Sequence, residues 1–262
     1  MNKDLLLAID AGNTNVVFAI FDGTSLLKRW RTSTNIKRTA DEYGVWLNHL
    51  IELTGIKVDA IGGAIIATVV PQLSSPLTQL CKRYFGCEPM LIDNGDSVQI
   101  DVEIIDRQEV GADRLVNAVA ANALYSGKLV VIDFGTATTF DVIRENGAYV
   151  GGVIAPGVNL SLEALDRAAA RLPRISVAKP ISVIGSGTVS AMQSGVYWGY
   201  ISLVEGIVTR IKEEIGDNLT TIATGGLASL FKGGTSYIDQ IEPDLTLNGL
   251  RIVYETRARG EK

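Results

Sequence analysis

Two predicted turns in this sequence combine an aspartate, a glycine and a series of hydroxyl or amide side chains, a combination suited to holding phosphate. The first spans Asp10 to Asn15, the second spans Asp133 to Thr139, and each follows an apolar run. Because Gly12 and Gly135 have no Cβ atom, the backbone can turn tightly there and an anion can approach it. The side chains that could donate hydrogen bonds to phosphate oxygens are Asn13, Thr14, Thr136, Thr138 and Thr139.

The two aspartates add a second chemical function to these turns. Asp10 and Asp133 each stand at the end of a predicted strand, where a carboxylate beside bound phosphates can serve as the hard oxygen ligand that Mg²⁺ requires. A single apolar run followed by Asp-x-Gly is often only a hairpin. The recurrence of the pattern in the second half of the chain favours phosphate binding.

Composition limits the class of protein. The chain has 262 residues, of which 47% are hydrophobic and 20% charged, which indicates large buried cores and room for two domains. Because the phosphate turn recurs, we expect two similar halves, covering residues 1–127 and 128–262. The net charge of -5 and the lack of a run of basic residues argue against a nucleic-acid partner and favour a small-molecule substrate.

Cysteine, histidine and the amino-terminal segment exclude further classes. Cys81 and Cys87 are too few ligands for a zinc site and indicate reduced thiols. His49 is the single histidine and lies away from the glycine-rich turns, so that a carboxylate is the expected proton acceptor. The apolar run before Asp10 is too short for a signal peptide or a membrane span, which predicts a cytoplasmic protein without a membrane partner.

Hydrophobic periodicity predicts the same arrangement of elements twice. In the first half the expected strands are residues 5–10, 15–21, 26–31, 60–70 and 90–92, with helices beginning at residues 39–42, 73 and 111–114. In the second half the expected strands begin at residues 129, 139, 149 and 220, with helices over residues 160–172 and 188–215. Three hairpin-connected strands followed by alternating helices and strands match the actin, heat-shock-70 and hexokinase architecture. The predicted fold is therefore α/β, with two duplicated ribonuclease-H-like lobes and a nucleotide cleft between them.

One common phosphate-binding motif is absent, and two further segments each allow both a structural and a functional interpretation. No Gly-x-x-x-x-Gly-Lys-Ser/Thr segment occurs, which excludes a P-loop. Gly111-Ala112-Asp113-Arg114 either starts a helix with an N-cap aspartate and a surface arginine, or supplies a base and an anion contact. Thr224-Gly225-Gly226 either ends a strand or lets adenosine pack on the backbone.

In combination and order, these segments resemble the type III pantothenate kinases over nearly the whole chain. The segments that carry the resemblance are Asp10-x-Gly12-Asn13-Thr14, Gly111-Ala112-Asp113-Arg114, Asp133-x-Gly135-Thr136, Gly151-Gly152-x-Ile154-x-Pro156-Gly157 and Thr224-Gly225-Gly226, with Ala67-Thr68-Val69-Val70-Pro71, Leu115-Val116-Asn117-Ala118 and Gln193-Ser194-Gly195 as background. The resemblance implies ATP-dependent phosphorylation of pantothenate to 4'-phosphopantothenate, the first step of coenzyme A biosynthesis.

The resemblance also implies roles for individual residues. The first phosphate loop would be Asp10, Ala11, Gly12, Asn13, Thr14, Asn15, Val16 and Val17. Asp10 would place Mg²⁺, Asp133 would bind a monovalent cation, K⁺ or NH₄⁺, and Thr136 would contact an ATP phosphate. Asp113 would accept the proton of the substrate hydroxyl. Gly111, Ala112 and Arg114 would line the pantothenate pocket with Asp113, while Thr188 would reach the substrate across a homodimer interface.

Departures from the family pattern leave alternatives open. Members often carry Asn-Pro and a tyrosine before the Gly-Ala-Asp-Arg segment, where this chain has Ile104 to Gln108, so that no aromatic substrate contact is assigned. The predicted dimer helix carries Val196, Trp198, Leu203 and Ile207, although Trp198 fits an ordinary core position equally well. Competing functions are another kinase or phosphatase of the superfamily, acting on acetate, a sugar or polyphosphate, and a non-catalytic regulator. Retention of all three carboxylates, Asp10, Asp113 and Asp133, argues against the regulator.

Overall fold

Each half of the chain builds a five-stranded mixed sheet, and the two sheets have the same topology. The computed structural model describes residues 4–92, 97–104, 106–168 and 173–260. The strand order is β3-β2-β1-β4-β5 in one sheet and β10-β9-β6-β7-β8 in the other. In both, the first three strands pair antiparallel and the remaining two join in parallel. The predicted pair of duplicated ribonuclease-H-like lobes is confirmed.

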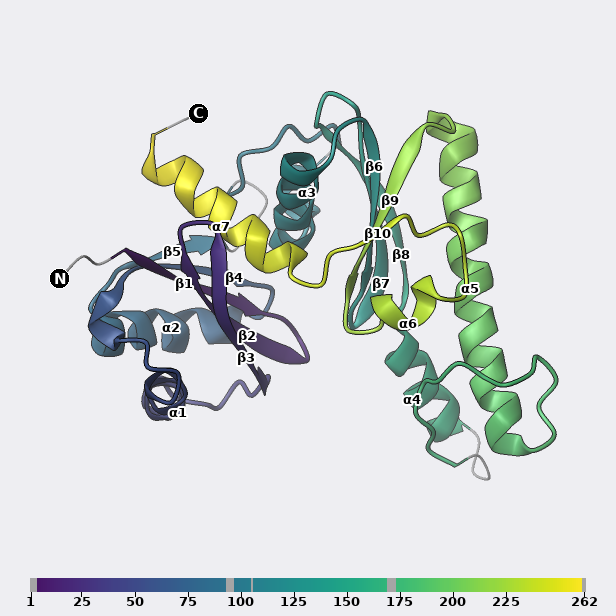
Figure 1. The fold of residues 1–262 in the computed structure, drawn as a ribbon, viewed down its shortest axis with the longest axis horizontal. Helices are drawn as coiled ribbons and strands as arrows, with labels where there is room; N and C mark the ends of the chain where they lie inside the picture. Colours follow the sequence, from purple (N-terminus) through teal and green to yellow (C-terminus); the bar gives the residue numbers. More distant parts are fainter. Residues whose placement is uncertain (1–3, 93–96, 105, 169–172, 261–262) are drawn as a thin grey trace. The chain divides into compact units, whose positions relative to one another are not determined.

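The strands and helices have the following bounds (Figure 1). The strands of the first sheet are β1 (Leu5–Ala11), β2 (Asn15–Asp22), β3 (Ser25–Ser33), β4 (Ile61–Thr68) and β5 (Pro89–Ile92). Those of the second are β6 (Lys128–Phe134), β7 (Ala137–Ile143), β8 (Tyr149–Pro156), β9 (Leu219–Gly225) and β10 (Gln240–Ile241). The α-helices are α1 (Ala40–Glu52), α2 (Pro71–Leu80), α3 (Ala112–Leu124), α4 (Val158–Ala168), α5 (Thr188–Ile215), α6 (Ala228–Lys232) and α7 (Leu245–Ala258). Short helical turns are η1 (Val58–Ala60), η2 (Cys81–Phe85) and η4 (Arg107–Glu109).

Local sequence signals account for the ends of several helices. Thr39 and Glu42 form a capping box before α1, in which the Glu42 carboxylate accepts from the Thr39 N–H at 2.8 Å and the Thr39 hydroxyl accepts from the Glu42 N–H at 3.3 Å. Helix α2 begins with Pro71 in its first turn, where a missing N–H costs nothing. Its continuation in η2 ends at Gly86, which has a φ of 63°.

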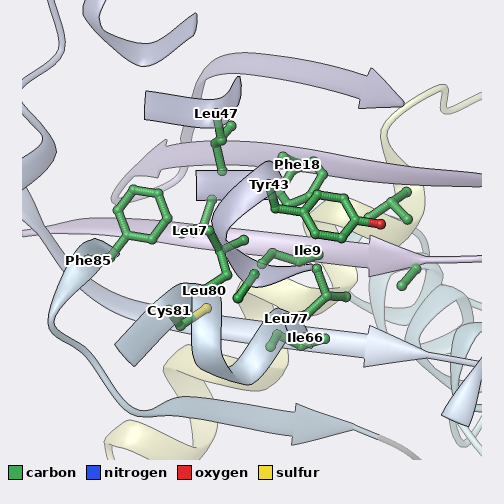
Figure 2. Close-up of a cluster of buried hydrophobic side chains, with 14 of the residues drawn as sticks. Leu7, Ile9, Phe18, Tyr43, Leu47, Ile66, Leu77, Leu80, Cys81 and Phe85 are labelled. Carbon is green, nitrogen blue, oxygen red and sulfur yellow. The ribbon is translucent and has the colours of Figure 1, made fainter. Parts of the chain in front are cut away.

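In the first unit, one face of the sheet packs beneath α1 and α2. The buried side chains at the centre of this core include Leu7, Ile9, Phe18, Tyr43, Leu47, Ile66, Leu77, Leu80, Cys81 and Phe85 (Figure 2). Successive side chains of a strand point to opposite faces. Leu7, Ile9 and Ala11 of β1 belong to this core, and Asp10 therefore lies on the other face.

The other face of the first sheet carries α7, which in turn contacts α3. The Tyr254 side chain of α7 lies directly over Gly63 of β4, where an added Cβ would be 2.0 Å from the tyrosine hydroxyl. Helix α7 also touches α3, because a Cβ on Gly249 would lie 2.2 Å from the Val116 carbonyl oxygen and the Thr246 hydroxyl donates to Asn117 at 2.7 Å.

The second unit repeats this plan with α5 and α6 over one face of its sheet. Val130, Ile132 and Phe134 of β6 pack against side chains of α5 and α6, with Phe134 and Phe231 stacked at 5.0 Å between ring centroids. Asp133 therefore lies on the face away from α5. The predicted dimer-helix side chains Val196, Trp198, Leu203 and Ile207 are partly buried against this same core.

The compact units divide the chain differently from a boundary at residue 127. The first unit contains residues 1–100, 105–120 and 245–262, and the second contains residues 101–104 and 121–244. The difference arises mainly from α7, which follows the second sheet in sequence and packs on β1 and β4 of the first.

Most predicted elements are present with shifted ends. The strand expected over 60–70 is the shorter β4, and the helix expected from residue 73 begins at Pro71. The predicted end of α4 at Leu172 lies outside the described residues. Sequence reasoning did not predict β10, α6 or α7. Within the described ranges, every helix is too short or too polar to cross a membrane.

We predict that Gly249→Ala destabilises the first unit. The new methyl group would meet the Val116 carbonyl oxygen, a backbone atom that cannot move aside, and overpacking of this kind typically costs about 1–3 kcal/mol. Thermal unfolding should show a lower Tm. Gly206→Ala in α5 is the matched control, because its methyl group would approach only the flexible end of Arg210 at 3.3 Å. Equal Tm values for the two variants would contradict the packing of α7.

Candidate active site

The first phosphate turn is a tight, pinned connection between β1 and β2. The Gly12 N–H donates to the Asn15 carbonyl at 3.0 Å, and Thr34 closes the turn from β3's end by donating its hydroxyl to the Gly12 carbonyl at 2.6 Å and its N–H to the Thr14 carbonyl at 2.9 Å. Asn13 is exposed, as is Thr14. The turn therefore presents polar side chains to solvent on a fixed backbone.

The run from Asp10 to Val17 contains both core and surface positions. Ala11 and Val16 are fully buried in the core beneath α1 and α2, so that they can offer a ligand only backbone atoms. Asp10 pairs with Val17 across the hairpin and is half-buried on the opposite face, the one that carries α7.

The second phosphate turn is one residue shorter. Gly135 donates its N–H to the Ala137 carbonyl at 3.1 Å, and both Gly135 and Thr136 are exposed. A Cβ on Gly157, the residue before α4, would lie 2.1 Å from the Thr136 carbonyl oxygen. Only glycine allows the start of α4 to lie this close to the turn.

Asp133 lies between two threonine-bearing strands. It pairs with Thr139 of β7 on one side and with Thr224 of β9 on the other. Gly225 follows with a φ of 87°, and a Cβ there would lie 2.7 Å from Asp133 Oδ1. The turn at Thr224-Gly225-Gly226 thus ends β9 and also packs its backbone against the Asp133 carboxylate.

The expected phosphate contact by Thr138 is wrong, and the hydroxyl of its neighbour Thr139 is hydrogen-bonded to another side chain. Thr138 is fully buried on the face beneath α5, because it pairs with Phe134, and a phosphate cannot reach it there. Thr139 lies on the opposite face and donates its hydroxyl to Asp141 Oδ2 at 3.0 Å.

Sequence reasoning missed Asp141, which lies on the same face of the second sheet as Asp133, and Tyr149, which contacts Asp141. Asp141 is fully buried and also accepts from the Tyr149 hydroxyl at 2.9 Å. The available signal was a charged residue in the otherwise apolar run from Phe140 to Ile143.

Asp113 lies in the first turn of α3, one residue after the helix begins. Its Oδ1 accepts from the Arg114 N–H at 2.9 Å, and Arg114 itself is half-buried rather than a surface side chain. A Cβ on Gly111 would lie 2.5 Å from the same Oδ1 atom, so that the backbone crowds the carboxylate.

The environment of Asp113 disfavours its charged form. Burial raises the pKa of the Asp113 carboxyl, and the Arg114 N–H and guanidinium lower it in part. Carboxyl groups with shifted pKa values are concentrated at functional sites. Asp113 also lies on the same side of the first sheet as Asp10, because α3 packs on α7 and α7 covers that face.

Thr188 belongs to the second unit and is the exposed first residue of α5. Ser190 closes the helix start by accepting from the Gly187 N–H at 3.1 Å and donating to its carbonyl at 2.9 Å. The segment before it folds back on α5, because Gly185 packs against the backbone of Ala191. Among the described residues, no three His, Cys, Asp or Glu side chains are grouped as a metal site.

Two topologically matched lobes, each with an exposed Asp-x-Gly turn at the end of its first strand, define the actin and hexokinase-like ATPase fold. Solved structures with this fold match over the whole chain. A Baf family transcriptional activator from Campylobacter jejuni matches with a TM-score of 0.59 and 18% identity, covering 97% of this chain and 99% of its own. The activator of 2-hydroxyisocaproyl-CoA dehydratase from Clostridium difficile, with bound ADPNP, has a TM-score of 0.54 at 12% identity, with both chains 98% covered. These matches show the fold.

Closer relatives define the family. The type III pantothenate kinase family matches residues 6–210. The type III pantothenate kinase of Paramagnetospirillum magneticum is 56% identical over 95% of this chain and 96% of its own, and that of Caulobacter vibrioides is 53% identical over 98% and 99%. The chain belongs to the type III pantothenate kinase family.

We predict that Gly111→Ala lowers turnover with little loss of stability. The added methyl group would displace the Asp113 carboxylate, which is a movable side-chain end, and a misplacement of about 1 Å can cost roughly a hundredfold in rate. Steady-state kinetics and thermal unfolding measure the two effects separately. Gly233→Ala is the control, because its φ of -69° suits alanine and no atom lies within 4 Å of the new methyl group. Full activity of Gly111→Ala would show that the position of Asp113 does not limit turnover.

Proposed function

We propose that this chain transfers the γ-phosphoryl group of ATP to the primary hydroxyl of pantothenate, with Asp113 as the proton acceptor. The observation that carries this proposal is the crowded, half-buried Asp113 at the start of α3, on the same side of the first sheet as Asp10. Membership of the family supports pantothenate as the substrate, and the local geometry supports the proposed roles of the residues. Cys81 and Cys87 are thiols rather than a disulfide, which accords with a cytoplasmic location.

The two turns are proposed to hold the triphosphate. Phosphoryl transfer requires mainly positioning and neutralisation of charge. Asn13 and Thr14 on the first turn and Thr136 on the second are exposed donors on backbones that hydrogen bonds or close packing hold in place. Asp10 would hold Mg²⁺, since that ion is usually bound by one or two carboxylates together with substrate phosphates.

Asp133 is the proposed ligand of a monovalent cation, K⁺ or NH₄⁺. The oxygen donors present fit such an ion. The Asp133 carboxylate is flanked by two strand-paired threonines, Thr139 and Thr224, and the Gly225 backbone lies close to it. When bound, the two cations would neutralise charge on the β- and γ-phosphates.

Asp113 is proposed to receive the proton that the pantothenate hydroxyl loses as its oxygen bonds to the γ-phosphorus and the bond to ADP breaks. The raised pKa of its carboxyl makes Asp113 a better base than an ordinary aspartate at neutral pH. Arg114 would contact the substrate carboxylate, and Gly111 and Ala112 would line the pocket.

A homodimer is proposed because apolar side chains are exposed around Thr188. Ile184 is 86% exposed and Ile181 is fully exposed, and Val183 and Val189 are exposed as well. An exposed apolar group of this kind marks an interaction surface. A second copy of this chain that covers it would bring Thr188 into a shared substrate site.

We predict that Asp113→Asn abolishes pantothenate phosphorylation while stabilising the protein. Loss of a general base typically costs about 10²–10⁴ in rate. The pKa of the Asp113 carboxyl is raised in the folded state, so that the substitution removes an unfavourable buried charge. The Tm of the variant should therefore exceed that of the wild type by an amount that grows as the pH rises above the unfolded-state pKa. This difference should level off above the folded-state pKa. Asp59→Asn, an exposed change in the first unit, is the control.

The assay combines purified protein, ATP, Mg²⁺ and K⁺, and follows 4'-phosphopantothenate by mass spectrometry. Acetate and glucose serve as competing acceptors. Phosphorylation of either in place of pantothenate would refute the proposed substrate, and full activity of Asp113→Asn would refute the proposed base.

We predict that Ile184→Glu gives a monomer with a raised KM for pantothenate. The charge would lie in the apolar surface around Thr188, where a partner subunit would have to desolvate it. Light scattering with size-exclusion chromatography measures the mass. Leu53→Glu, at a 71% exposed position after α1, is the control and should leave the dimer intact. A wild-type protein that is itself monomeric would overturn the dimer and the role of Thr188.

A further inference from the structure

Asp141 is a fully buried carboxylate that the proposed reaction does not use. Burial of an ionised group is costly unless hydrogen bonds compensate it. Here the Tyr149 hydroxyl donates to Oδ1 at 2.9 Å and the Thr139 hydroxyl donates to Oδ2 at 3.0 Å. Each oxygen therefore has a defined hydroxyl partner.

Strand register places this group beside Asp133. Asp133 pairs with Thr139, and Val131 pairs with Asp141, so that Thr139 and Asp141 lie on the same face of the sheet as Asp133. Directly paired residues have Cβ atoms about 5 Å apart. Thr139 thus stands between the buried carboxylate and the proposed cation ligand.

The hydrogen bond to Asp141 determines whether the Thr139 hydroxyl acts as a hydrogen-bond donor or as an oxygen ligand on the side of Asp133. A threonine hydroxyl has one proton to donate and two lone pairs. Because the proton is directed to Asp141, the lone pairs are what remains for a group on the Asp133 side. A hydroxyl held in this way is an oxygen ligand for a cation rather than a donor to an anion.

Tyr149 fixes Asp141 from the other side. The Tyr149 side chain is 1% exposed, and its backbone is held by the preceding segment, since its N–H donates to the Asp101 carbonyl and its carbonyl accepts from the Glu103 N–H, each at 2.8 Å. The carboxylate therefore has little freedom to turn away from Thr139.

We propose that Asp141 is a positioning residue that orients the Thr139 hydroxyl, and that Thr139 is a ligand of the monovalent cation at Asp133. This inference rests on the proposed role of Asp133. It assigns binding of the cation to the half-buried Thr139 hydroxyl as well as to Asp133, and the orientation of that hydroxyl to the buried Asp141 carboxylate.

The test compares Thr139→Val with Thr138→Val, neighbouring changes on opposite faces of β7. The Thr138 hydroxyl is buried without a hydrogen-bond partner, so that valine there removes no interaction. Two quantities are measured: the K⁺ concentration for half-maximal phosphorylation, and the rise in Tm that K⁺ produces relative to choline at equal ionic strength.

Thr139→Val should raise the half-saturating K⁺ concentration by about tenfold or more and reduce the K⁺-induced rise in Tm, the loss expected for a disturbed cation site. Asp141→Asn should act in the same direction, because an amide cannot accept from both hydroxyls with its two terminal atoms. Thr139→Ser restores the hydroxyl and should behave as wild type, as should Thr138→Val.

Unchanged K⁺ dependence in Thr139→Val would overturn the inference, as would a wild-type protein indifferent to K⁺ in both measurements. A lower Tm without K⁺ and an unaltered half-saturation would assign these residues a structural role only. In another outcome, the wild type is inactive on pantothenate while K⁺ still raises its Tm and does not raise the Tm of Thr139→Val. That result would refute the proposed substrate and support Thr139 as the cation ligand. Should Asp141→Asn not fold, the valine and serine variants of Thr139 decide the question.

Discussion

Strand register is the constraint on which the rest of this structure depends. Each central strand pairs antiparallel with the next strand of its hairpin and in parallel with the strand that follows the first crossover. This double pairing fixes which face each side chain takes, and a slip of one residue would exchange the faces. Asp10 thereby lies on the face away from α1 and α2, and Asp133 lies on the face away from α5. Their neighbours in sequence fill the two cores.

Much of the fold could be predicted because helix caps, strands and turns depend on residues that are close together in the sequence. The capping box at Thr39, the apolar strand runs and the two Asp-x-Gly turns each depend on neighbouring residues. Helix α7 escaped prediction because Thr246, Asn248 and Gly249 are weak helix formers, and its stability comes from packing on β1, β4 and α3. Long-range packing of that kind leaves little trace in a local pattern.

The site was predictable to a similar degree. Spacing and residue type predicted the two turns, whereas the family resemblance predicted the role of Asp113, which lies in the first turn of α3. Thr138 and Thr139 are indistinguishable as residue types, and only the register with Phe134 and Asp133 separates a buried position from one beside the carboxylate. Asp141 was missed because its partner Tyr149 comes from the next strand.

The return of α7 to the first unit has a consequence for how this protein is made. The second unit is almost continuous in sequence, whereas the first requires residues 245–258, which the ribosome adds after both sheets have been synthesised. Until then the face of β1 and β4 that receives α7 lacks its cover, and exposed apolar strands are sites of misassembly during synthesis. The first unit therefore cannot be completed until the second sheet has been synthesised.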